Sequence, residues 1–183
     1  MSIMKAFATG TLVLAIGVAS ATAATSAEQQ DAADARVQVT WTNPADFSEA
    51  KESNGSGLGR EPPDQWLGDL AKHLRYRAER VLPTGQSLQV TFTNVQRAGT
   101  YEPWRGPQWD DVRIIKDLYP PRIDLKFTLT DASGVVREGT RVLRDPSFMQ
   151  RGLLNESDPL RFEKRMLDDW LRREFPDGGD ARG

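Results

Sequence analysis

The sequence predicts an α+β fold, in which a mixed, mostly antiparallel sheet of about four strands carries two main helices on one face. Three observations lead to this prediction. Apolar and polar residues alternate in several short segments, which is typical of strands with one buried face. Two longer segments carry apolar residues at helical spacing. The first of them lies between two strands, which allows a right-handed crossover and a parallel strand pair.

The first half of the domain is predicted to run strand, helix, strand. Val37–Trp41 alternates apolar and polar side chains, and the Asn-Pro pair that follows ends the strand. The glycine-rich segment Ser48–Arg60 indicates a mobile surface loop. A helix then begins near Asp64, its expected N-cap, and carries an apolar stripe over Trp66–Leu82. Leu88–Phe92 alternates again and forms the second strand.

The next strands form a hairpin. The pattern of the second strand slips at Asn94-Val95, which indicates a bulge. Ile123–Thr130 is the clearest strand of the chain. A turn over Asp131–Gly134 returns it as Val135–Leu143, with a further bulge expected at Gly139.

A last helix closes the domain. Ser157 and Asp158 are expected to cap it with Pro159 at its first position, and its apolar stripe covers Leu160–Phe175. Its charged side chains are interpreted as a solvated face with near-neighbour ion pairs. Val112–Leu118 fits either a helical turn or a strand.

The N-terminus has the pattern of an export signal. Met1–Lys5 is a short positive head, Ala6–Ser20 is uncharged, and Ala21–Ala23 has the small residues that a signal peptidase accepts. We predict cleavage after Ala23, with an uncleaved membrane anchor as the alternative. A disordered leader is expected at 24–35, one domain at 36–176 and a disordered tail at 177–183. The mature protein is then expected in the bacterial periplasm or outside the cell, without stable membrane insertion.

Composition excludes several classes of function. With 24 basic and 26 acidic residues the net charge is −2, so nucleic acid is not an expected partner. The chain has no cysteine, which removes disulfides, thiol catalysis and cysteine metal sites. The only histidine, His73, lies within the first helix and is interpreted as a half-buried or surface side chain. We expect no cofactor and no metal.

Three acids could carry acid-base chemistry, namely Glu102, Asp110 and Asp111. Paired carboxylates hydrolyse glycosidic bonds when they are held at a suitable separation, which nothing in the sequence fixes. Asp111 is better explained as the cap of the next segment. We therefore assign no catalytic residue.

The most unusual stretch is Ala98–Arg122, where aromatic, basic and proline residues are mixed. In a structural interpretation, its tryptophans pin a long loop over an open sheet face and its arginines pair with nearby acids. In a functional interpretation, aromatic faces and arginine donors form a cleft for a sugar, a peptide or an anionic envelope component. The candidate ligand-binding residues are Tyr101, Glu102, Trp104, Arg105, Trp109, Arg113, Tyr119 and Arg122.

Five motifs resemble, in order, a bacterial domain of unknown function numbered 3016. They are Val39–Pro44 (VTWTNP), Leu82–Gln86 (LPTGQ), Glu102–Pro107 (EPWRGP), Val112–Ile123 (VRIIKDLYPPRI) and Asp158–Trp170 (DPLRFEKRMLDDW). The resemblance covers most of Val37–Phe175. It implies a secreted, single-domain envelope protein, and it assigns no activity, cofactor or site residue.

The preferred hypothesis is a non-catalytic periplasmic domain that binds or supports another envelope component, either a protein or a small ligand. The alternatives are a carboxylate-dependent hydrolase acting on glycan or peptide, and a periplasmic folding helper or enzyme inhibitor.

Overall fold

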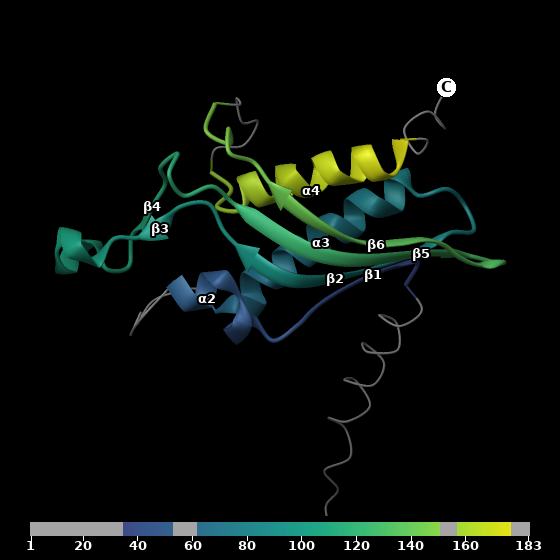
Figure 1. The fold of residues 1–183 in the computed structure, drawn as a ribbon, viewed down its shortest axis with the longest axis horizontal. Helices are drawn as coiled ribbons and strands as arrows, with labels where there is room; N and C mark the ends of the chain where they lie inside the picture. Colours follow the sequence, from purple (N-terminus) through teal and green to yellow (C-terminus); the bar gives the residue numbers. More distant parts are fainter. Residues whose placement is uncertain (1–34, 53–61, 151–156, 177–183) are drawn as a thin grey trace, which may run out of the picture. The chain divides into compact units, whose positions relative to one another are not determined.

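The structure is a computed structural model that describes residues 35–52, 62–150 and 157–176. These residues form a four-stranded sheet, a separate two-stranded sheet and several helices (Figure 1). In chain order the elements are β1 (Val37–Trp41), the 3₁₀ turn η1 (Pro44–Asp46), α2 (Ser48–Glu52), α3 (Pro63–Val81), β2 (Ser87–Gln96), β3 (Thr100–Tyr101), η2 (Pro103–Arg105), η3 (Pro107–Trp109), β4 (Arg113–Ile114), β5 (Arg122–Asp131), β6 (Gly134–Arg144) and α4 (Arg161–Glu174).

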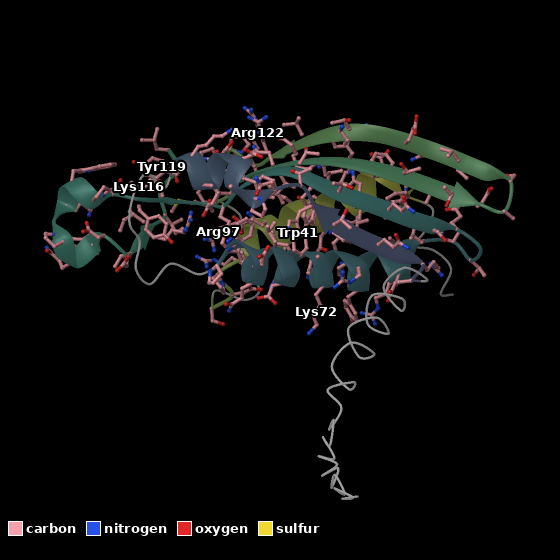
Figure 2. All side chains as sticks on the ribbon, turned by 90° about the horizontal axis from the view of Figure 1, so that it is seen from below. Trp41, Lys72, Arg97, Lys116, Tyr119 and Arg122 are labelled. Carbon is pink, nitrogen blue, oxygen red and sulfur yellow. The ribbon has the colours of Figure 1, made fainter. Side chains whose placement is uncertain are left out.

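The main sheet has the strand order β1-β2-β5-β6. Strand β1 runs parallel to β2, with Val37 opposite Leu88, and the other two pairs are antiparallel. Helix α3 makes the crossover between the parallel strands. It lies beside α4 on one face of the sheet (Figures 1 and 2). The predicted α+β fold, with its parallel pair and its hairpin, is confirmed.

The core fills the space between that face and the two helices. Trp66 of α3 and Trp170 of α4 are 1% and 2% exposed. Trp170 meets Phe127 of β5 and Phe175 edge-on, with ring centroids 5.7 and 6.0 Å apart. Burial of a large apolar side chain contributes roughly 1.5–3 kcal/mol. Because the chain has no disulfide, this packing is what holds the helices to the sheet.

The opposite face of the sheet carries polar side chains. Thr91, Lys126 and Thr140 lie side by side on β2, β5 and β6, and Lys126 and Thr140 are exposed. The alternation that predicted the strands therefore separates a buried face from a face open to water.

One of the two expected bulges is correct. The β2–β5 register shifts between Phe92 and Asn94, as the slipped pattern indicated. The bulge expected at Gly139 is wrong, because this residue pairs regularly with Phe127. A Cβ at Gly139 would lie 3.3 Å from the Phe127 ring and 2.7 Å from the guanidinium of Arg141. The glycine thus leaves room for Arg141, whose guanidinium lies 5.0 Å from the Phe127 centroid.

Both expected helix caps are wrong in detail. Helix α3 has no side-chain cap, and Asp64 lies inside its first turn. A carboxylate there still favours the helix, since it faces the positive end of the helix dipole. The carboxylate of Asp158 accepts the N–H of Leu160 at 2.9 Å and forms a turn before α4, so Pro159 precedes the helix.

The segment expected to be a loop begins as helix α2. The side chain of Asn94 at the end of β2 accepts the N–H of Ser48 at 2.7 Å and donates to its Oγ at 3.0 Å, while Phe47 is buried. Residues 53–60 of the expected loop lie outside the described residues, as do the expected signal at 1–23, the leader over 24–34 and the tail at 177–183. None of the helices in the described ranges has the length and apolarity needed to cross a membrane.

Ion pairs of α4 mostly reach other elements. One pair is a near-neighbour pair, Arg172 with Asp169. Asp168 instead accepts hydrogen bonds from His73 and Arg77 of α3, at 2.9 and 3.0 Å. These contacts tie the helices together, and His73 is half-buried as the sequence indicated.

Residues 97–121 form an arm that extends past the end of the main sheet between β2 and β5 (Figure 1). Strands β3 and β4 pair antiparallel within it. The ambiguous segment Val112–Leu118 therefore contains a short strand and no helix. The expectation that this stretch folds over the open sheet face is wrong. Its backbone hydrogen bonds join residues of the arm to one another, within the arm and at its base.

Candidate functional site

Arg113 fixes the base of the arm. Its guanidinium donates to the carbonyls of Ala98 and Gly99, at 3.3 and 2.9 Å, and forms an ion pair with Glu49 of α2. It also lies 4.8 Å from the ring centroid of Tyr101. One side chain thus joins both strands of the arm to the body of the domain.

Two further residues support this base. Gly99 has a left-handed backbone with φ of +80°, and a Cβ there would lie 2.6 Å from the carbonyl oxygen of Ile114. Glu163 of α4 is fully buried, and its Oε1 accepts the N–H of Ala98 at 2.6 Å. Burial raises the pKa of Glu163. The arm therefore leaves the sheet in one fixed direction.

Glu102 joins the outgoing limb of the arm, which also contains Arg105, to the returning limb, which contains Lys116 and Tyr119. We call these contacts of Glu102 the lock of the arm. Its Oε1 accepts hydrogen bonds from Lys116 Nζ at 2.5 Å and from Tyr119 Oη at 2.9 Å, and Arg105 pairs with its Oε2. The side chain is 1% exposed. The hydrogen bond from Lys116, helped by those from Tyr119 and Arg105, outweighs burial and lowers the pKa of Glu102 from 4.5 to about 2. Lys116 and Tyr119 appear together within the arm in Figure 2.

Large apolar side chains are exposed on the arm. Trp104 is 72% exposed and Leu118 is 75% exposed, and Trp109 and Val112 are also open to solvent. The guanidinium of Arg105 lies 5.9 Å from the ring centroid of Trp109. The arm therefore shows apolar surface to solvent, while the polar groups of Arg105, Lys116 and Tyr119 face Glu102.

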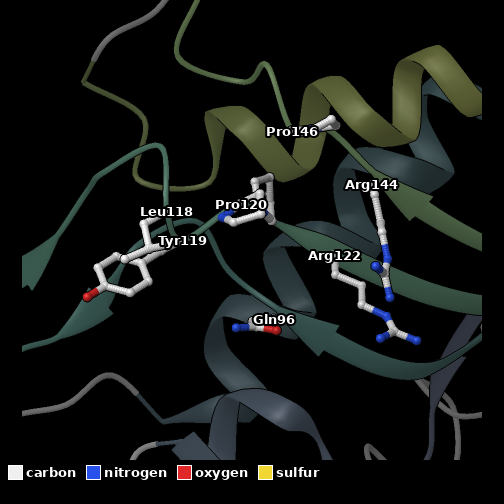
Figure 3. Close-up of a pocket in the computed structure, with 8 residues that line it drawn as sticks. Gln96, Leu118, Tyr119, Pro120, Arg122, Arg144 and Pro146 are labelled. Carbon is white, nitrogen blue, oxygen red and sulfur yellow. The ribbon is translucent and has the colours of Figure 1, made fainter.

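A pocket of about 590 Å³ lies where the arm returns to the sheet (Figure 3). Its polar wall consists of Gln96, Arg122 and Arg144 at the ends of three neighbouring strands. Its other residues are mainly apolar, namely Leu118, Tyr119, Pro120, Pro121 and Pro146.

The structure places the eight candidate residues in four settings. Glu102, Arg105 and Tyr119 form the lock of the arm, and Tyr101 and Arg113 lie at its base. Trp104 and Trp109 are on its exposed surface, and Arg122 lines the pocket together with Tyr119. They do not gather in one cleft.

The acids considered for catalysis are dispersed. Glu102 is enclosed by cationic partners, whereas Asp110 and Asp111 are exposed in the turn after η3. Strand β4 follows Asp111, so there is no helix for this residue to cap, and that expectation is wrong. Within the described residues, no three His, Asp or Glu side chains are grouped so that they could hold a metal ion.

Sequence reasoning missed the acids that support the arm, Glu49 and Glu163. Glu163 had a readable signal. It shares helical spacing with the buried residues Met166, Leu167 and Trp170, so it lies on the buried face of α4. Nothing in the sequence connects Glu49 to Arg113, because their contact depends on tertiary structure alone.

A family of proteins of unknown function, DUF3016, matches residues 35–173, which comprise nearly the whole folded domain. The chain belongs to the DUF3016 family. The resemblance of the five motifs is thereby confirmed. No curated protein and no solved structure matches the chain. The DUF3016 domain here includes the arm, the pocket and most of α4.

Proposed function

We propose that this DUF3016 protein is an exported, non-catalytic domain of the bacterial envelope that holds a partner protein through its arm. The observation that carries the proposal is the arm's exposed apolar surface. Of the nine large apolar side chains that are exposed within the described residues, four lie between residues 104 and 118. Exposed apolar groups that gather in one segment are typical of interaction sites.

The lock on Glu102 supports this proposal. A binding surface on a flexible loop must be ordered when the partner arrives, which reduces affinity. Here the lock and the Arg113 contacts order the arm in advance. Tryptophan is enriched among residues that dominate binding energy. Trp104 is therefore the expected centre of the contact.

A protein partner fits this surface better than a sugar. Leu118 and Val112 add exposed aliphatic surface to the two tryptophans. Sugar sites rely on aromatic faces with polar donors beside them, but Lys116 and Arg105 are both committed to Glu102. The exposed aliphatic side chains and the engaged donors thus favour a protein partner over a sugar.

The chemistry of Glu102 argues against the hydrolase alternative. A general acid must hold a proton near neutral pH, and a pKa of about 2 leaves this carboxylate ionised. Both of its oxygens already accept hydrogen bonds. It is therefore suited to hold the arm and poorly suited to donate a proton.

Site-specific photo-crosslinking in cells of the source bacterium tests the arm. A crosslinking residue in place of Trp104 should yield one discrete protein adduct, which is lost when Trp109 is also changed to Ala. The matched control places the crosslinker at Tyr76, which is 54% exposed on α3. Equal adducts at both positions, or none at Trp104, would overturn the proposal.

Export has its own test. Fractionation of cells that produce the full chain should release the protein with the periplasm, with Ala24 as its first residue. Retention of an uncleaved chain in the membrane fraction would contradict export as a free domain.

A further inference from the structure

The pocket beside the arm has a feature that partner binding by the arm does not use. Arg122 on β5 and Arg144 on β6 are directly opposite in the antiparallel register. Residues that pair in this way project from the same face of the sheet. Figure 3 shows both side chains on one side of the pocket, with their guanidinium groups near each other in this view. Two like charges are thus held side by side.

Only one of these two charges is balanced. Arg122 donates from Nε and Nη2 to the two oxygens of Asp124, at 2.8 and 2.7 Å. The side chain of Arg144 makes no hydrogen bond or ion pair with any other residue in the described ranges, and it is exposed. Like charges that face each other across a strand pair destabilise the sheet. The pair therefore leaves one uncompensated positive charge at the pocket.

The rest of the pocket is apolar and stiff. Pro120, Pro121 and Pro146 line it, and the ring of proline restricts the backbone and offers no N–H donor. Leu118 covers another side. A ligand that fits here needs an anionic group at one end and an apolar body at the other.

We propose that this pocket binds a small amphiphilic carboxylate, whose carboxylate lies against Arg144 and Arg122 and whose hydrocarbon part lies against Leu118 and the prolines. A guanidinium matches the two oxygens of a carboxylate. The volume of about 590 Å³ is within the range of small-molecule sites. This site shares Leu118 with the exposed surface of the arm but includes neither tryptophan, so the inference goes beyond the proposed partner binding.

Titration of the mature protein with octanoate, followed by NMR, tests the proposal. Octanoate should shift the backbone signals of Gln96, Leu118 and Arg144. Acetate lacks the apolar body and 1-octanol lacks the charge, so each should bind at least about tenfold more weakly, which is the effect of losing about 1.4 kcal/mol. If either probe matches octanoate, or if the shifts lie elsewhere, the proposal is wrong.

A matched pair of variants tests the role of Arg144. Arg144→Gln should weaken octanoate binding by about tenfold or more, as expected for the loss of a charge-assisted contact. Lys126→Gln removes the same charge from the same sheet face outside the pocket, and it should bind like the parent. If octanoate binding is weakened equally in both variants, the effect comes from net charge alone and the proposed site is wrong.

A last comparison separates the two proposals. The side chain of Arg144 makes no hydrogen bond or ion pair with the described residues, and its removal relieves the repulsion with Arg122, so the variant should fold with a thermal midpoint no lower than that of the parent. Arg144→Gln should keep the crosslink at Trp104, and Trp104→Ala should keep octanoate binding. Loss of octanoate binding on Trp104→Ala would show that the pocket is not an independent site.

Discussion

The hydroxyl of Tyr119 donates a hydrogen bond of 2.9 Å to Oε1 of Glu102, which joins the returning limb of the arm to its outgoing limb. The same tyrosine lines the pocket. The lock that orders the arm therefore also holds one wall of the pocket. The hydrogen bond raises the pKa of Tyr119, so the tyrosine remains a neutral donor at neutral pH.

Acid should open the arm before it unfolds the domain. The pKa of Glu102 is lowered from 4.5 to about 2, so its contribution to stability is fully present above pH 4.5 and is lost as the pH falls toward 2. Hydrogen exchange measured over this pH range should show residues 100–119 losing protection while the strands of the main sheet keep theirs.

The control for this prediction is Glu102→Gln. Because Gln cannot ionise, its arm should exchange rapidly at neutral pH and show no further loss of protection on acidification. If the variant keeps the acid-dependent change of the parent, another group controls the arm and the assignment to Glu102 fails.

Gly99→Ala should destabilise the protein more than Gly85→Ala. Both glycines have left-handed backbones, with φ of +80° and +84°. A non-glycine residue loses about 1–2 kcal/mol in that conformation. At Gly85 nothing lies within 4 Å of the added Cβ, whereas at Gly99 the carbonyl oxygen of Ile114 lies 2.6 Å away. The crowding should add about 1–3 kcal/mol.

Urea unfolding together with hydrogen exchange of β3 and β4 measures this difference. The larger loss of stability at position 99 should be accompanied by reduced protection of the arm from hydrogen exchange. Equal losses at the two positions would mean that the arm yields to the added methyl group, and that its base is less rigid than the contacts indicate.

Two tryptophans of the same chain should differ sharply in their effect on stability. Trp66 is 1% exposed, and its replacement by Ala should reduce the free energy of unfolding by about 3–5 kcal/mol. Trp104 is 72% exposed, and its replacement should change this energy by no more than about 0.5 kcal/mol. Thermal denaturation compares them. A large loss at Trp104 would show that it packs within the fold instead of facing a partner.

Asp168→Ala should loosen the contact between α3 and α4. Burial by itself would raise the pKa of Asp168, but the hydrogen bond from His73 and the charge of Arg77 outweigh it and lower the pKa. Loss of this charge-assisted network should reduce the free energy of unfolding by about 1–2 kcal/mol. Asp69→Ala removes the same charge from an exposed position on α3 and should have little effect in the same urea titration.

Sequence patterns predicted the structure reliably where it depends only on the regular spacing of apolar residues. The alternation in Ile123–Thr130 predicted both the strand and its buried face, and the slip at Asn94 predicted the bulge. Helix starts were less reliable. Asp158 has the right residue type for a cap, but it bonds the N–H of Leu160 in a turn outside α4. Whether such a side chain caps the helix or forms a turn before it depends on the backbone geometry, which the residue type alone does not determine.

The candidate site was only partly predictable for a similar reason. The sequence marked residues 98–122 as unusual by composition, and the arm, residues 97–121, coincides with this stretch to within one residue at each end. It did not separate Arg113, which is bonded to the base of the arm, from Arg122, which lines the pocket. Both are arginines among aromatics in sequence, and only their partners distinguish them.

The sequence by itself determined the four strands of the main sheet, helices α3 and α4, their apolar faces and the membership of the DUF3016 family, because these follow from residue type and short spacing. Only the tertiary structure decided that residues 97–121 extend as an arm, that Glu102 is a lock, and that Arg122 and Arg144 face each other. These depend on contacts between residues far apart in the chain. Glu49 meets Arg113, and β6 returns beside β5, only after the domain has folded around its core.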